Sequence, residues 1–114
     1  MDARFIQRGD SIDFRPDRDV VAGEVVVLGN LVGVAKLDIG AGELGALALE
    51  GVFEMTRSPR YAFIGCGKVA WSERLRAVVG MTEPGAVPIG HNLRSTRIGD
   101  STMTVRLCQG VRTP

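Results

Sequence analysis

The sequence predicts a mainly β fold: one compact domain of the β-barrel or β-sandwich type, with an extended N-terminal arm and at most one short helix. Three observations lead to this prediction. The length of 114 residues suits a single domain. The 15 glycines are about twice the usual share, and tight turns use glycine. Short runs rich in valine and leucine recur between these turn signals, as they do in all-β domains.

The first half of the chain predicts an arm followed by strands. We assign residues 1–114 to one β-rich domain and residues 1–9 within it to the arm. The segment "SIDFRP" alternates polar and apolar residues and ends at Pro16, which predicts a short strand. Two apolar runs flank Gly29-Asn30 in "VVVLGNLVGVAKL" and predict a hairpin with a two-residue turn. The segment "ALALEGVFEM" is expected to be one extended stretch.

The second half is less regular. Ser58-Pro59 is typical of a helix start, so the segment to Ile64 could form one or two helical turns. "KVAW" predicts a strand, whereas "SERLRAVVG" fits either a helix capped by Ser72 or a strand. "EPGAVPIGHNL" predicts a turn that leads into an edge-type strand. "GDSTMTVRLCQG" has the clearest strand alternation in the chain.

The stretch Gly40–Gly45, "GAGELG", fits the glycine pattern G-x-G-x-x-G of dinucleotide-binding loops. Such a loop needs a helix directly after it and an acidic residue about 20 residues further on. Here Gly51 interrupts the following segment, and residues 64–68 contain no carboxylate. We therefore interpret the stretch as a hairpin connection in which Gly40 and Gly42 adopt positive φ, and an oxidoreductase function is the least supported hypothesis.

No catalytic, cofactor-binding or metal-binding residue is predicted, so we expect no enzyme activity and no cofactor. Cys66 and Cys108 form no C-x-x-C motif and are expected to be structural thiols. His91 has no nucleophile motif around it and is expected at the surface or in an interface. Trp71 is expected in the core rather than in an interface. Four spaced aspartates lack the glycine and glutamate of a calcium loop: Asp10, Asp13, Asp17 and Asp19.

Charge is distributed unevenly although the net charge is only +1. Residues 1–57 contain 6 Lys/Arg and 10 Asp/Glu, a balance of −4, whereas residues 58–114 contain 8 and 3, a balance of +5. Chance and internal pairing explain this, or else the acidic surface of one subunit meets the basic surface of another. The N-terminus has no apolar signal core and no segment is long enough to span a membrane, so we expect a soluble, intracellular protein.

The order of segments resembles that of a known family. The motifs are "FIQRGDSIDF", "AGEVVVLGNLVGVAKLDIGAGELGALALEGVFEM", "GCGKVAW", "IGHNL" and "GDSTMTVRL". Together they resemble the tailed-phage capsid cement, or head decoration, proteins, small β-rich proteins formerly labelled predicted phage recombinases. The resemblance implies a β-rich fold that oligomerises as a homotrimer on the outside of an expanded capsid, and it implies no reaction.

We therefore predict a structural capsid cement protein on the virion surface. Its expected partners are the major capsid protein and further copies of itself, and not a membrane, a small-molecule substrate or nucleic acid. Phe5, Ile6 and Arg8 are expected to contact the capsid or a neighbouring subunit. The alternative hypothesis is a nucleic-acid-associated phage or prophage protein that binds DNA through its basic C-terminal half, with Arg94, Arg97 and Arg106.

Overall fold

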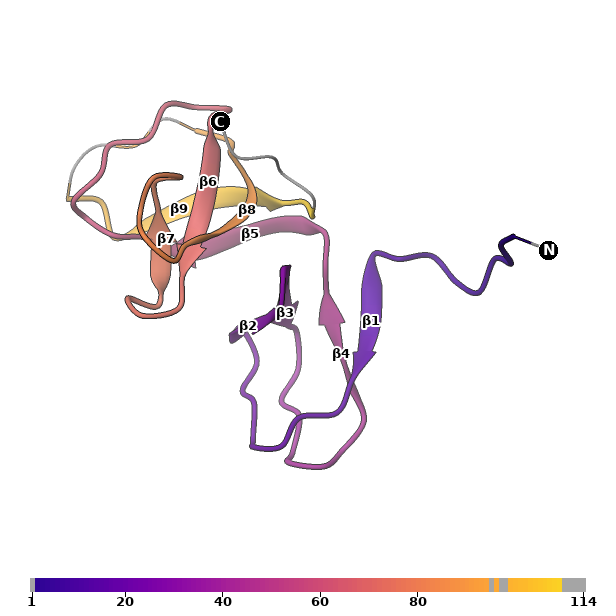
Figure 1. Cartoon of the computed structure of the whole chain (residues 1–114). Coiled ribbons are helices and arrows are strands. Elements are labelled where there is room, and N and C mark those ends of the chain that lie inside the picture. The colour runs from indigo at the N-terminus through magenta and orange to yellow at the C-terminus, as the bar shows by residue number, and fades with distance from the viewer. Residues whose placement is uncertain (1, 95, 97–98, 110–114) are drawn as a thin grey trace.

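The computed structural model describes residues 2–94, 96 and 99–109, and Figure 1 shows them as two antiparallel sheets. No helix occurs in this part of the chain, which confirms the predicted β class. The strands found there are β1 (Ser11–Phe14), β2 (Val25–Leu28), β3 (Leu31–Ala35), β4 (Gly45–Ala48), β5 (Gly51–Thr56), β6 (Lys68–Ser72), β7 (Ala77–Val79), β8 (Val87–Asn92) and β9 (Thr102–Leu107).

The first sheet has the strand order β1-β4-β3-β2. Its β2–β3 hairpin turns at Gly29-Asn30 as predicted, and Gly29 has a φ of +60°, which suits glycine. β3 and β4 are also antiparallel neighbours, joined by residues 36–44. At the crowded centre of the sheet, a Cβ on Gly33 would lie 2.8 Å from the Cβ of Leu47, so only glycine fits there.

The second sheet has the order β5-β9-β8-β6-β7. A parallel bridge between Arg57, which follows β5, and Val78 in β7 joins the two outer strands. The sheet therefore curls until its edges meet, which reduces the length of open edge. Figure 1 shows this curled sheet above the smaller first sheet.

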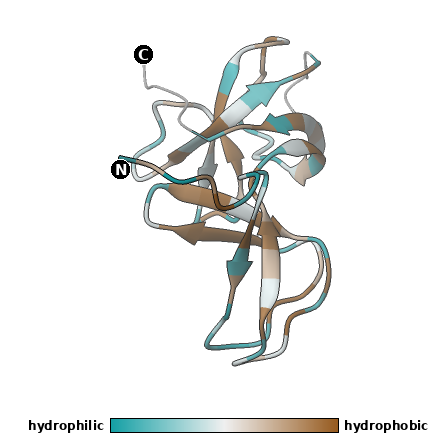
Figure 2. Ribbon diagram, turned by 90° about the vertical axis from the view of Figure 1, so that its right-hand side faces the viewer, coloured by the Kyte–Doolittle hydropathy of each residue, from teal (hydrophilic) through white to brown (hydrophobic). Residues whose placement is uncertain are grey.

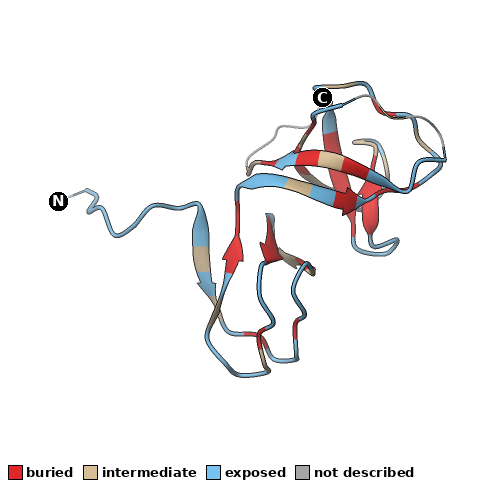
Figure 3. Ribbon diagram, turned by 180° about the vertical axis from the view of Figure 1, so that it is seen from behind, coloured by how far each residue is buried: buried red, intermediate tan, exposed pale blue. Residues whose placement is uncertain are grey.

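The main core lies between the two sheets, and a second cluster lies on the other face of the first sheet. Figure 3 shows the buried residues along the strands, and Figure 2 shows that many strand residues are hydrophobic. The buried members of the main core are Val25, Val32, Val34, Met55, Phe63, Val69, Trp71, Val78, Ile89, Met103, Val105 and Leu107. The buried members of the second cluster are Val20, Ala35, Ile39 and Leu47.

The predicted helical turns after Ser58 do not form. The side chain of buried Arg57 donates hydrogen bonds from Nε (3.1 Å) and Nη2 (3.0 Å) to the carbonyl of Ser58, and also to the carbonyl of Tyr61. These carbonyls are thereby occupied by a side chain instead of helical N–H groups. The segment is a turn followed by irregular chain.

Two strand predictions are corrected. "ALALEGVFEM" is not one stretch but two strands, β4 and β5, in different sheets, because the chain turns at Gly51 with a φ of +136°. β8 is not an edge strand, since it lies between β9 and β6. It tolerates Pro88 in that position because the β6–β8 register shifts there, and Ile89 is the extra residue of a bulge.

Candidate interaction surfaces

The N-terminal segment, residues 2–9, is exposed along its whole length. Residues 2–8 have no regular secondary structure, and Figures 1 and 3 show the segment leading away from both sheets. Phe5 and Ile6 are 79% and 75% exposed, and Arg8 is exposed beside them. Large apolar side chains with this exposure suit contact with another molecule. This exposure is compatible with the predicted contact role of Phe5, Ile6 and Arg8, which stays a prediction.

The loops that connect β1 to β2 and β3 to β4 form a second surface, which we call the acidic loop tip (residues 19–22 and 36–44). A bridge holds the two loops together: Val20 and Ile39 exchange N–H···O bonds of 2.9 and 2.8 Å. Two carboxylates reinforce it. Oδ1 of Asp19 accepts a hydrogen bond of 2.8 Å from the N–H of Ala41. Oδ1 of Asp38 accepts a hydrogen bond of 2.7 Å from the N–H of Ala22.

Apolar side chains project from this tip. Val21, Leu37 and Leu44 are 60%, 76% and 61% exposed. Two shallow hollows lie between them, of about 290 and 380 Å³, and they share Asp38 and Ile39 in their linings. Apolar side chains around shallow hollows, with carboxylates beside them, are features of a protein contact surface.

The "GAGELG" stretch forms part of the same tip. It is the hairpin connection from β3 to β4, as predicted, and Gly45 begins β4 instead of a helix. Without a helix N-terminus, the stretch lacks the anion site of a dinucleotide loop. Only Gly42, with a φ of +77°, has positive φ, so the expectation for Gly40 is wrong. A Cβ at Gly40 would lie 2.1 Å from a carboxylate oxygen of Glu43, but this exposed side chain can move away, so the available space does not require glycine there.

A row of basic side chains crosses the second sheet. Lys68 of β6 pairs with His91 of β8, which in turn pairs with Arg106 of β9. Lys68 and Arg106 are exposed and His91 is half-buried, so the row lies on the outer face of the sheet. Arg94 is also exposed, just after β8. Arg97, the third predicted arginine, lies outside the described residues.

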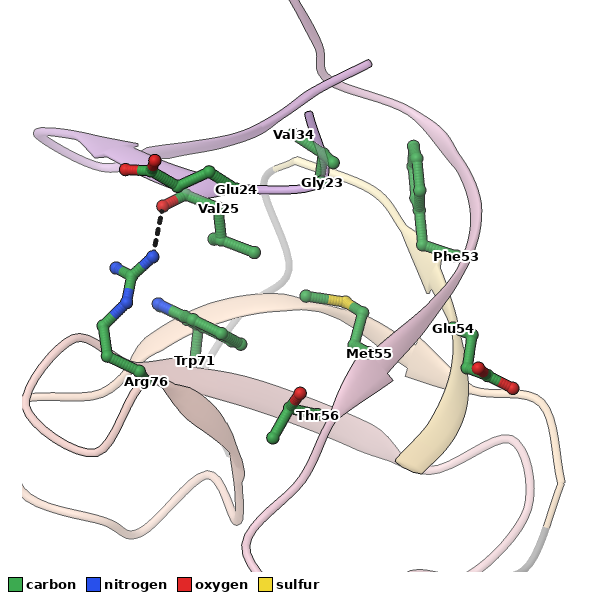
Figure 4. Close-up of a pocket in the computed structure, with 10 residues that line it drawn as sticks. All are labelled: Gly23, Glu24, Val25, Val34, Phe53, Glu54, Met55, Thr56, Trp71 and Arg76. Atoms are coloured by element: carbon green, nitrogen blue, oxygen red, sulfur yellow. Dashed lines mark hydrogen bonds between the residues drawn. The ribbon is translucent and has the colours of Figure 1, made fainter. Parts of the chain in front are cut away.

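A cavity of about 300 Å³ lies between the sheets, and Figure 4 shows its lining. Trp71 is only 4% exposed there, which confirms its place in the core. Its Nε1–H donates to Glu73 (3.0 Å), and the Arg76 guanidinium lies 5.2 Å from the centre of its ring. Arg76 also donates a 2.9 Å bond to the carbonyl of Val25 and so links the two sheets.

The remaining candidate residues of the sequence are not brought together into a reactive site. Cys66 is exposed and Cys108 half-buried, and both are free thiols. Among the described residues, no three His, Cys, Asp or Glu side chains are placed to hold a metal ion. The same part of the chain contains no helix with the length and apolar character that a membrane span requires.

The uneven charge distribution of the sequence becomes a separation in space. The acidic first half of the chain supplies the first sheet and the basic second half supplies most of the second sheet. Arg18 and Glu24, whose Nη2 and Oε2 lie 2.5 Å apart, pair beside the first sheet, and the hydrogen bond from Arg18 lowers the pKa of Glu24. Ion pairs among the described residues around the second sheet include Arg57–Asp100, Arg74–Glu83 and Arg76–Glu73. Each of these four pairs lies within one sheet region.

Comparison with known protein families identifies a match. The model of a family described as phage cement protein matches residues 6–107, which covers both sheets and part of the N-terminal segment. No curated protein and no solved structure matches the chain significantly.

Proposed function

This chain belongs to the phage cement protein family, and on that basis we propose that it binds the outside of the expanded capsid and stabilises the shell. The observation that carries the proposal is the family match, which extends over residues 6–107 of the 114-residue chain. Membership supports a structural role in the phage capsid. We propose in addition that the protein binds the outer surface of the shell, prefers the expanded shell and stabilises it.

The fold suits such a role. Two sheets joined by a shared core form a stable body, while the exposed N-terminal segment is available to bind beyond it. An extended segment can add to the strand of a neighbour through backbone hydrogen bonds. Many copies on a symmetric shell gain from multivalency, so each contact can be weak. A protein that binds only the expanded shell shifts the equilibrium toward that state.

The proposed partners are the major capsid protein and further copies of this chain, arranged as a homotrimer on the virion surface. Phe5, Ile6 and Arg8 are proposed to contact the shell or a neighbouring copy, because two apolar side chains and a cation lie exposed together there. The protein is proposed to act without catalysis, as a binding and bridging component.

Co-sedimentation with shells of the major capsid protein from the same phage tests this proposal. We expect binding to expanded shells, saturating at a fixed ratio to shell subunits, and no binding to unexpanded shells. Phe5→Ser with Ile6→Ser should weaken binding at least tenfold. Ile64→Ser is the matched control, because Ile64 is 82% exposed but lies far along the chain, in the loop before β6. Equal binding to both kinds of shell would contradict the expanded-state proposal.

A second candidate function, DNA binding, is favoured by the basic row of Lys68, His91 and Arg106 on the second sheet. A protein that neutralises phosphates loses affinity steeply as salt is added. Titration of duplex DNA at rising salt, with Arg94→Gln and Arg106→Gln combined, tests this function. Binding that falls with salt and with the double substitution would support it, and absence of binding at low salt would eliminate it.

A further inference from the structure

We propose that the N-terminal segment of one copy docks on the acidic loop tip of a second copy. The inference rests on the proposed function for the binding role of residues 2–9, and it names the surface that receives them. It makes the contact between copies head-to-tail, with two different surfaces meeting.

Both surfaces present large exposed apolar side chains, two on the segment and three on the tip. The segment presents Phe5 and Ile6, and the tip presents Leu37 and Leu44 around one shallow hollow, with Val21 beside the adjoining one. All five side chains are at least 60% exposed in the single chain. Contact between the two sets would remove from water most of the large apolar side chains that this half of the molecule exposes.

The charges of the two surfaces are opposite. Arg4 and Arg8 flank Phe5 and Ile6 in "RFIQR". The tip carries three exposed carboxylates, Asp19, Asp38 and Glu43, against one exposed cation, Lys36, which lines the hollow beside Leu37. Opposite charges around an apolar centre fix the direction of docking and speed association. Because the charges lie at the surface, added salt should weaken the contact.

The position of the segment favours a second copy as its partner. The N-terminal segment joins the first residue of β1, whereas the tip follows the last residue of β1, in the connection of residues 15–24 to β2. The segment and the tip therefore lie at opposite ends of this strand. Figure 1 shows the segment leading away from the tip of its own molecule. A contact between unlike surfaces repeats from copy to copy and closes into a ring when the rotation allows it, which is compatible with the proposed trimer.

Photo-cross-linking of the free protein tests the docking without any shell. A photoreactive phenylalanine analogue replaces Phe5, and this protein is mixed with an isotope-labelled copy that lacks the analogue, at about 1 mM to populate even a weak contact. We expect intermolecular cross-links to residues 36–44 or 19–22, reduced by added salt. The same analogue placed at Ile64 is the control and should not cross-link to these residues.

A mixing experiment tests the head-to-tail geometry. One variant lacks residues 2–9 and keeps the tip; the other carries Leu37→Ser, Leu44→Ser and Glu43→Lys and keeps the segment. We expect neither variant to associate with itself in sedimentation, and the mixture to form a heterodimer. Far-ultraviolet circular dichroism shows whether both variants remain folded.

Several results would overturn the docking proposal. These are cross-links from position 5 that map to the second sheet, an absence of intermolecular cross-links at the highest concentration, or a mixture that behaves like its separate components. Shell co-sedimentation distinguishes this failure from failure of the proposed function. If shells bind the protein but cross-links avoid the tip, the cement role stands and the docking surface is wrong.

Discussion

The side-chain amide of Gln109 pairs with the backbone of Val32 in the way that a strand residue would. Its Oε1 accepts a bond of 3.1 Å from the Val32 N–H, and its Nε2 donates a bond of 2.7 Å to the Val32 carbonyl. Nε2 also donates a 2.9 Å bond to the carbonyl of Leu49, where the chain passes from β4 to β5. One side chain after β9 therefore fastens the second sheet to β3 of the first sheet and to the connection between β4 and β5.

Replacing Gln109 should loosen the junction of the sheets. Gln109→Ala removes three hydrogen bonds and should lower the free energy of unfolding by about 1–3 kcal/mol. Gln109→Glu should cost more, because a carboxylate would face two carbonyl oxygens without donors. Its excess cost should shrink in acid, where a protonated carboxyl can donate once. Urea denaturation at neutral and acidic pH measures both effects, and equal stabilities for the two variants would contradict the pairing.

Arg76 provides the second link between the sheets, and its backbone is in the left-handed region with a φ of +53°. Arg76→Ala loses the bond to Val25 and should destabilise the fold by about 1–2 kcal/mol. Arg76→Gly should cost less, because glycine adopts this φ without the penalty of about 1 kcal/mol that other residues pay. Trp71, the only tryptophan, should shift its fluorescence in both variants. An alanine variant as stable as the glycine variant would show that backbone strain contributes nothing.

The strands that the sequence predicted best are those with a local signal. Alternation indicated β1 and β9, and Gly29-Asn30 indicated the β2–β3 turn, because a half-buried strand and a two-residue turn each depend on neighbouring residues. The placement of β4 and β5 in different sheets and the burial of Arg57 could not be predicted in this way. Gly51 indicates a turn but not a change of sheet, and the contacts at both places include residues distant in the chain, Gln109 at Leu49 and Asp100 at Arg57.

The interaction surfaces were predicted in part. The run "RFIQR" indicated an apolar and basic N-terminal segment, since nothing in the sequence offered Phe5 a core partner. The acidic loop tip was missed because its two loops are separated along the chain and meet only through the Val20–Ile39 bridge. The signal that could have found it is the pair of leucines that flank the "DIGAGE" turn, Leu37 and Leu44, which no strand pattern required.

Glu24 should make stability depend on pH in the acid range. Its pKa is lowered from the usual 4.5, chiefly by the hydrogen bond from Arg18. A carboxyl with a lowered pKa in the folded state stabilises that state above pH 4.5, and the contribution disappears as the pH falls through the lowered value. Glu24→Gln should therefore reduce stability at neutral pH and converge with the wild type in strong acid. Thermal unfolding across the acid range measures this, and parallel curves would contradict it.

Tyr61 should have the opposite dependence at alkaline pH. Its hydroxyl donates to Glu83, which raises the pKa of Tyr61 above the usual 10.0. The stabilisation is complete below pH 10.0 and is lost as the pH rises through the raised value, because tyrosinate cannot donate. The chain has one tyrosine, so ultraviolet absorbance of tyrosinate reports this residue alone. Glu83→Gln should lower the pKa of Tyr61 toward its usual value, with the part caused by burial remaining, whereas Glu73→Gln should leave it unchanged.

Gly90 should be the glycine least tolerant of substitution, since two constraints coincide there. Its φ is +150°, and a Cβ would lie 1.9 Å from the carbonyl oxygen of Arg106 in the neighbouring β9. That carbonyl is backbone in the interior of the second sheet, so it cannot move without breaking the β8–β9 ladder. Gly90→Ala should therefore cost more than about 3 kcal/mol and leave little folded protein.

Gly85→Ala is the matched control for Gly90→Ala. Gly85 also has positive φ, +77°, but a Cβ there would meet no atom within 4 Å. Its substitution should cost only the backbone penalty of about 1–2 kcal/mol. Urea denaturation compares the two variants with the wild type. If they were equally stable, the contact with Arg106 would contribute nothing, and the bulged β8 strand would be able to move away from β9 at this position.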